Sequence, residues 1–153
     1  MATETGATPA FGALGPILGV LVMAAVMLLA YYVIGGANAN FSVAMGIVSH
    51  AFVVSMLGSL LFILILYLKP PGTIDLDNPV ATNLGAFLPG STPKPLMSLG
   101  KSIDVFSLWT LLLISIGFAT FNPRKLKGKS FSIAISVWAV YVVIKMGGAW
   151  IFS

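Results

Sequence analysis

The sequence contains no cysteine, and only 8% of its 153 residues are charged. Without cysteine the chain cannot form a disulfide, a thiolate metal site or a thiol nucleophile. One histidine and four acidic residues are too few ligands for a metal centre built by this chain alone. Because a soluble domain typically carries about a quarter charged residues, the scarcity of charge excludes a soluble protein.

The few charges are also unevenly distributed. The net charge is +4, and half of the eight basic residues lie between positions 124 and 129. This distribution provides no basic face of the kind that a nucleic-acid-binding domain needs, so nucleic acid is not an expected partner. The sequence likewise contains no nucleophile–base pair, paired carboxylates or glycine-rich phosphate loop, which argues against an enzyme.

What the sequence does contain is long apolar runs. Hydrophobic residues make up 58% of the chain, and the mean hydropathy is +1.03. We therefore predict an all-α fold, a polytopic transmembrane helical bundle embedded in the lipid bilayer. A polar tail, residues 1–13, lacks the basic start of a signal peptide and precedes a single transmembrane domain, residues 14–153. The four predicted spans are about 14–35, 41–68, 103–121 and 131–152.

The only long loop in this prediction, residues 69–101, is rich in proline. Pro79 suits the first position of a helix, so we expect a surface helix near 79–88. A second short surface turn is expected around 96–99. The third span then begins after Ser102, which can cap it.

A basic turn after the third span indicates the orientation of the chain. Arg124, Lys125, Lys127 and Lys129 are close together, and positively charged loops face the cytoplasm. We therefore expect residues 122–130 to be cytoplasmic, with the turn around 35–40 on the same side and the long loop and both termini on the other. The same four residues suit anionic lipid headgroups, although topology alone accounts for them.

Two rows of small residues are candidates for helix packing. Gly15 and Gly19 have the spacing that lets helix backbones approach closely in lipid. A chance pairing in a glycine-rich chain explains them equally well. Ala51, Ser55 and Ser59 form a second candidate row on the next span.

Three ionisable residues lie within or at the ends of the spans. Asp104 and Lys145 occur at similar depths, so we predict an ion pair between the third and fourth spans; the alternative is that each reaches the headgroups separately. His50 is able to ligate haem or a chlorophyll-type pigment, or to relay protons. With no second ligand at its depth, a hydrogen bond to a backbone carbonyl or a serine is the favoured interpretation.

Several short motifs are similar to those of a known family. The segments DNP (77–79), ATNLG (81–85), SIDVFSLW (102–109), IGFA (116–119) and NPRK (122–125) are distributed along the chain. Together they resemble the bacterial branch of the Yip family, the relatives of Ypt/Rab-interacting membrane proteins, over roughly residues 14–152. The resemblance implies a five-helix, non-enzymatic membrane scaffold whose eukaryotic partners are Rab-type GTPases and other family members. With four spans, this chain looks like a short form that lacks the first span.

The leading hypothesis is a non-enzymatic scaffold or interaction protein of the Yip type without a cofactor of its own. Its expected location is the bacterial inner membrane, and its expected partners are other membrane protein subunits or a second copy. One alternative is an accessory subunit of a photosynthetic or respiratory complex that contacts haem or a pigment through His50. A second is a component of a small transporter, with Lys145 and Asp104 near the path of the substrate.

Overall fold

The computed structural model describes the backbone of residues 7–70 and 80–151 and, within these ranges, the side chains from residue 14 onward. This part of the chain is helical and contains no β-strand, which confirms the predicted all-α class. An isolated bridge between Asn83 and Asp104 is its one extended pairing. The helices are α1 (Ala7–Val33), α2 (Phe41–Ala51), α3 (Val53–Leu68), η1 (Leu84–Phe87), α4 (Lys94–Ser102), α5 (Val105–Phe121), α6 (Pro123–Leu126) and α7 (Ser130–Ile151).

Three stretches are long and apolar enough to cross a membrane. They are Leu14–Val33 in α1, Phe41–Leu68 across α2 and α3, and Ser130–Ile151 in α7. The fourth predicted span corresponds to α5, which is apolar but has only 17 residues. Three of the four predicted spans are therefore confirmed as helices long enough to cross a membrane, and the fourth corresponds to a shorter apolar helix.

The second span consists of two helices in series. Phe52 separates α2 from α3 but keeps helical backbone angles, with φ −68° and ψ −13°. The amide of Ser55 bonds to the carbonyl of Phe52, three residues earlier, where a regular α-helix would use the fourth. The predicted single span therefore contains one tighter turn of the 3-10 type at Phe52.

The predicted surface helix at 79–88 is wrong. Within the described residues it is reduced to the single 3-10 turn η1. Directly before that turn, the backbone is instead extended at Asn83. The amide of Leu84 donates to the carbonyl of Ile103, next to the start of α5, at 3.1 Å. The local start signal at Pro79, which lies outside the described residues, could not reveal this long-range pairing.

The boundary between the surface region and α5 also differs from the prediction. The surface turn expected around 96–99 is the nine-residue helix α4, and Ser102 ends this helix rather than capping the next. Ser102 Oγ donates to the carbonyl of Ser98 at 2.7 Å. The cap of α5 is Asp104, whose carboxylate accepts a hydrogen bond from the amide of Ser107 at 3.0 Å.

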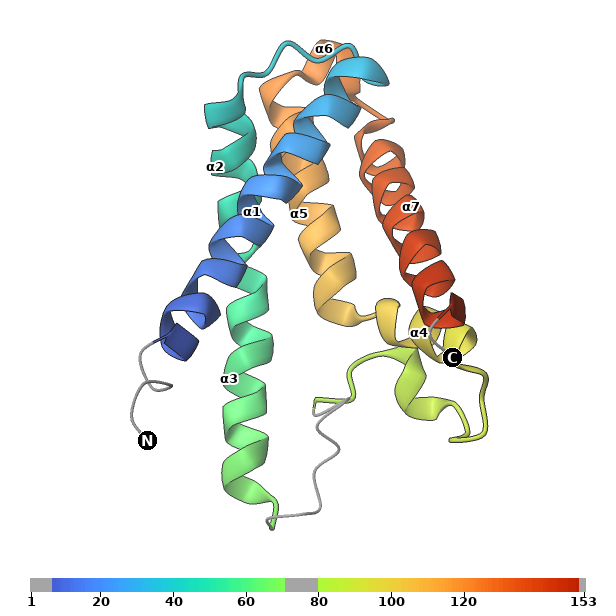
Figure 1. Cartoon of the computed structure of the whole chain (residues 1–153). Helices are drawn as coiled ribbons and strands as arrows, with labels where there is room; N and C mark the ends of the chain where they lie inside the picture. The colour runs from blue at the N-terminus through green and yellow to red at the C-terminus, as the bar shows by residue number, and fades with distance from the viewer. Residues whose placement is uncertain (1–6, 71–79, 152–153) are drawn as a thin grey trace.

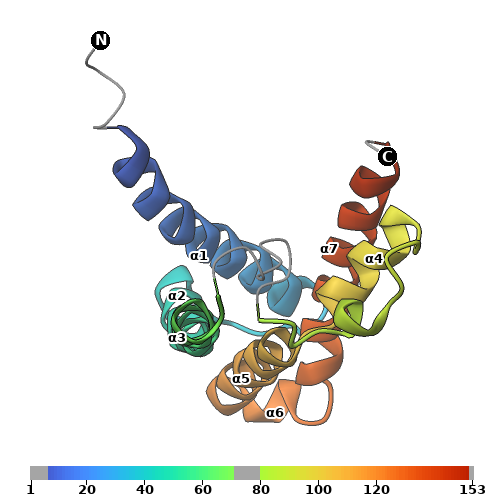
Figure 2. The ribbon, with the colours of Figure 1, turned by 90° about the horizontal axis from the view of Figure 1, so that it is seen from below.

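The helices connect two opposite ends of the molecule (Figure 1). One end, here called the turn end, contains the α1–α2 connection (residues 34–40) and the basic turn (residues 122–130). The other, the loop end, contains η1, α4 and the end of α7. Helix α1 packs on α2 and α7, α5 packs on α2, α3 and α7, and α4 packs on α7. Figure 2 shows α1 and α7 diverging as they leave the turn end.

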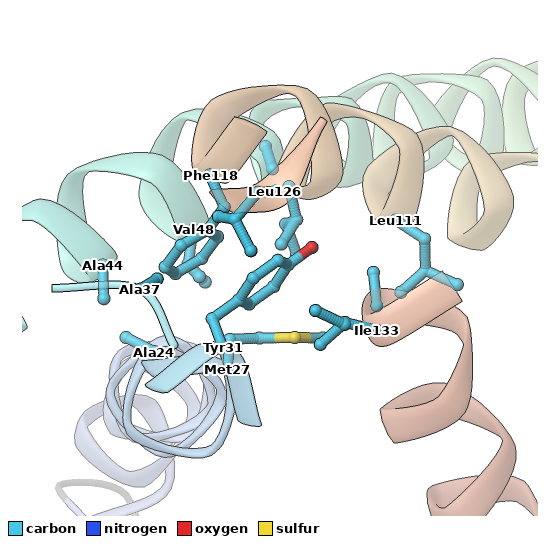
Figure 3. Close-up of a cluster of buried hydrophobic side chains, with 13 residues drawn as sticks. Ala24, Met27, Tyr31, Ala37, Ala44, Val48, Leu111, Phe118, Leu126 and Ile133 are labelled. Atoms are coloured by element: carbon cyan, nitrogen blue, oxygen red, sulfur yellow. The ribbon is translucent and has the colours of Figure 1, made fainter. Parts of the chain in front are cut away.

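The hydrophobic core lies near the turn end, where these helices converge (Figure 3). The ring of Tyr31 is at its centre, among side chains from α1, α5, α6 and α7. The largest fully buried side chains are Tyr31, Phe118, Met27, Ile114, Leu126 and Val48. The turn end is therefore the best-packed part of the described structure.

Candidate functional site

A tyrosine and a serine link three helices within this core. The ring of Tyr31 stacks on the ring of Phe118, with centroids 4.0 Å apart and planes within 5°. Tyr31 Oη donates to the backbone carbonyl of Ser130 at 2.8 Å. Ser130 Oγ lies 3.0 Å from Tyr31 Oη and donates to the carbonyl of Ser115 at 2.6 Å. These contacts join α1, α5 and α7 at one point.

The basic turn is joined to the α1–α2 connection by a second set of contacts. Lys125 Nζ donates to the carbonyl oxygen of Gly36 at 2.8 Å. Leu126 is fully buried in the core. A Cβ at Gly35 would lie 2.6 Å from Leu126 Cδ2 and 2.6 Å from the carbonyl of Tyr31, so only glycine fits there. These contacts bring both connections to the same end of the molecule, as the predicted topology requires.

All four cations of the basic turn are exposed at the surface of the turn end. Unlike Lys125, the side chains of Arg124, Lys127 and Lys129 form no hydrogen bond with the described residues. The amide of Lys127 bonds to the carbonyl of Pro123 at 3.2 Å, and that of Lys129 bonds to the carbonyl of Leu126 at 3.1 Å. The backbone therefore holds these side chains in a defined turn.

Asp104 and Lys145 both lie at the loop end, but each has a neutral partner. Asp104 accepts from Thr82 Oγ1 at 2.6 Å and from Ser107. Lys145 Nζ donates to Ser102 Oγ at 3.2 Å. Across the described ranges, no direct ion pair joins the two charges, and each instead ties a span to the surface region.

His50 forms a hydrogen bond within its own helix. Its Nδ1 lies 2.7 Å from the carbonyl oxygen of Gly46. Because a carbonyl only accepts, Nδ1 carries the proton and Nε2 is the acceptor of the neutral ring. His50 is exposed beside a shallow groove between α2 and α5, which Ile47, Leu113 and Ile116 also line.

The predicted packing rows lie mostly on the surface. Gly15 and Gly19 are exposed, and a Cβ at either position would have no neighbour within 4 Å. On the second span only Ala51 is buried, whereas Ser55 and Ser59 are exposed, with Ser59 Oγ donating to the carbonyl of Ser55. Within this single chain, the glycine row is therefore an open helix face.

Large apolar side chains cover the exposed sides of the long helices. Examples are Leu18 and Leu29 on α1, Leu60 on α3, and Val143 and Ile144 on α7. A soluble protein of this size could not expose such surfaces along several helices, whereas lipid tails cover them readily. The fold and these surfaces define an all-helical integral membrane protein.

Comparison with known protein families identifies the family of this chain. Residues 1–147 match the Yip1 domain, and the chain belongs to this family. No curated protein and no solved structure gave a match. Membership of the Yip family, inferred from the short motifs, is thus confirmed, whereas the bacterial branch and the short form stay predictions. The matched region extends through the N-terminal tail.

Few features of the sequence indicate the contacts at the turn end. Tyr31 lies at the end of a span, where tyrosine usually favours the membrane interface, yet it is completely buried. The sequence around Ser115 and Ser130 does not distinguish them from the other serines of the spans. Their one signal is that a hydroxyl inside a membrane protein needs a hydrogen-bond partner.

Proposed function

We propose that this protein is a non-enzymatic membrane scaffold of the Yip type that binds other membrane proteins or a second copy of itself through its exposed helices. The observation that carries the proposal is the contrast between its polar and apolar groups. The polar contacts of Tyr31, Ser130 and Lys145 tie the molecule's own helices together. The outward surfaces of the long helices remain apolar.

The face of α1 that carries Gly15 and Gly19 is the contact surface that we favour. Its glycines allow another helix to approach the α1 backbone closely, because none of the described residues occupies the space beside them. Close approach in lipid adds van der Waals contacts that a smooth leucine surface does not provide. The proposed partner is therefore a transmembrane helix with a similarly small-residue face.

Substitution of Gly19 by leucine tests this contact. Gly19→Leu should weaken association in liposomes by about 1–2 kcal/mol, or roughly 5- to 30-fold. Gly147→Leu is the matched control. Gly147 is also exposed on a long helix, and a Cβ added there would have no described neighbour within 4 Å. Energy transfer between labelled copies, together with cross-linking in native membranes for other partners, would measure the effect. Equal association of both variants and the wild type would refute the proposed surface.

We place the protein in the inner membrane of a bacterium, with the basic turn in the cytoplasm. The concentration of four cations in one connection supports this orientation. The contact between Lys125 and Gly36 supports the same side for the α1–α2 connection. The exposed turn would then be available to the anionic surface of the cytoplasmic leaflet.

His50 favours a second candidate function, that of a pigment- or haem-contacting subunit of a larger complex. The bond from Nδ1 to Gly46 leaves Nε2 as the ring nitrogen able to bind a metal at an exposed position. An absorbance spectrum of protein purified from native membranes tests this function. A Soret or Qy band that His50→Leu removes would support it, whereas a wild-type spectrum without either band would eliminate it.

A further inference from the structure

The cations at the turn end have no acidic neighbour in the described part of the chain. The sequence contains four acids, and of these only Asp104 lies in the described residues, where it belongs to the loop end. Arg124, Lys127 and Lys129 are exposed and form no ion pair with other described residues. Their charge is therefore balanced by something other than the described chain.

The turn presents these cations on a well-anchored support. Leu126 is completely buried between them, and the hydrogen bonds of the turn hold the backbone on both sides of it. Gly128 has φ +84°, which lets the chain reverse sharply between Lys127 and Lys129. Because the backbone of the turn is already ordered, binding an anion does not carry the additional entropy cost of ordering this loop.

The position of the turn suits the headgroup region of a bilayer. It connects two apolar helices, α5 and α7. Phe121 and Phe131, which flank it, are 46% and 43% exposed, respectively. Exposed apolar rings favour burial at the boundary between the acyl chains and the headgroups, so the neighbouring cations would lie near the depth of the lipid phosphates.

Lys125 is set apart from the other three cations. Its ammonium group donates to the carbonyl of Gly36 and so bonds to the chain itself. Its role within the fold is to hold the α1–α2 connection against the basic turn. By charge alone the four residues are equivalent. The structure distinguishes Lys125, which bonds to the α1–α2 connection, from the other three cations of the turn.

We propose that Arg124, Lys127 and Lys129 form a binding surface for the phosphate headgroups of anionic phospholipids, whereas Lys125 acts as a structural latch. The guanidinium of Arg124 is suited to bidentate contact with a phosphate, and the two lysines supply point charges beside it. Each such residue strengthens binding to an anionic membrane roughly fivefold. This inference rests on the membrane placement in the proposed function but not on any protein partner.

Thermal unfolding of the purified full chain in a neutral detergent tests the proposal. Added phosphatidylglycerol should raise the unfolding midpoint, whereas equal amounts of phosphatidylcholine or inorganic phosphate should not. The inorganic phosphate arm separates a lipid headgroup from a soluble anion. Raising the salt concentration from about 0.1 M to about 1 M should abolish most of the increase, because exposed charges are then screened.

Four variants separate the two roles. The combined substitution Arg124→Gln, Lys127→Gln and Lys129→Gln should remove the phosphatidylglycerol increment. Lys125→Gln should lower the midpoint in detergent alone but keep the increment. Lys69→Gln, which removes an exposed charge after α3, is the control that should change neither. Lys127→Gln alone should reduce the increment and covers the case in which the triple variant does not fold.

An undiminished increment in the triple variant, or in Lys127→Gln if the triple variant does not fold, would overturn the proposal. So would a loss of the increment in Lys125→Gln alone, since the latch would then be the lipid ligand. The test contains only protein, detergent and lipid. Its result is therefore distinguishable from failure of the proposed protein–protein contact, which the Gly19→Leu experiment measures separately.

Discussion

Tyr31 and Tyr32 are neighbours at the end of α1, but the fold places them in different environments. Tyr31 is 0% exposed, stacks on Phe118 and bonds to Ser130, whereas Tyr32 is 61% exposed. A buried hydroxyl in lipid must find a protein partner, and Ser130 provides it. The two residues therefore form a matched pair for testing what the buried hydroxyl contributes.

Tyr31→Phe keeps the aromatic ring and removes only that hydroxyl. Because the carbonyl of Ser130 loses its donor, we expect the free energy of unfolding to fall by about 1–2 kcal/mol. Tyr32→Phe should leave it within about 0.5 kcal/mol of the wild-type value. Unfolding of both variants by titration with a denaturing detergent would measure the difference. Equal stability of the two would show that the hydroxyl network contributes nothing.

At the scale of elements, the connection between α1 and α2 depends on close contact with the basic turn. Gly35 lies against Leu126, and Gly36 has φ +64° and accepts a hydrogen bond from Lys125. The left-handed backbone at Gly36 is one that residues with side chains rarely adopt. Two adjacent glycines thus allow the chain to reverse between α1 and α2 in close contact with the basic turn.

Gly35→Ala should therefore weaken the packing of these two connections. The new methyl group would meet Leu126 Cδ2 and the carbonyl of Tyr31, and we expect a loss of about 1–3 kcal/mol in the free energy of unfolding. Gly15→Ala adds the same methyl group to an open face and should be neutral or stabilising by up to about 1 kcal/mol. Thermal unfolding of the two purified variants compares them. A Gly35→Ala protein as stable as Gly15→Ala would contradict the close contact.

The sequence was sufficient to locate the spanning helices because their signal is local. Long apolar runs must become helices in lipid, whatever their neighbours are. The structure of the region between the second and third spans is not determined by local hydrophobicity in this way. Its structure depends on contacts distant in sequence: Leu84 pairs with Ile103, and a Cβ at Gly100 would lie 3.1 Å from the Cα of Gly85. The predicted helix at 79–88 was wrong because its local start signal could not outweigh these contacts.

The candidate site was predictable only in part, for a related reason. The basic residues were recognisable from charge density alone, since topology depends on charge and not on geometry. Their division into a latch, Lys125, and three outward cations was not, because it depends on the position of the Gly36 carbonyl. The partners of Asp104 and Lys145 could not be predicted either, since Thr82 and Ser102 belong to elements whose placement the sequence did not reveal.

For the whole molecule, the structure supports a polarised arrangement in the membrane. The turn end contains the core and the basic turn, and the loop end contains the surface helix α4 and the contacts of Asp104 and Lys145. The apolar helices between them provide the surfaces proposed for partner binding. Lipid binding at one end and helix association along the sides would be separate activities of one scaffold.

The most direct test of this account is the side of the membrane that each end faces. The chain has no cysteine, so a single cysteine at either end gives an unambiguous label. In intact cells, a membrane-impermeant maleimide should react with Ser91→Cys at the loop end. It should react with Lys127→Cys, in the basic turn, only after permeabilisation. Reaction of Lys127→Cys in intact cells, or of both variants from the same side, would contradict the account.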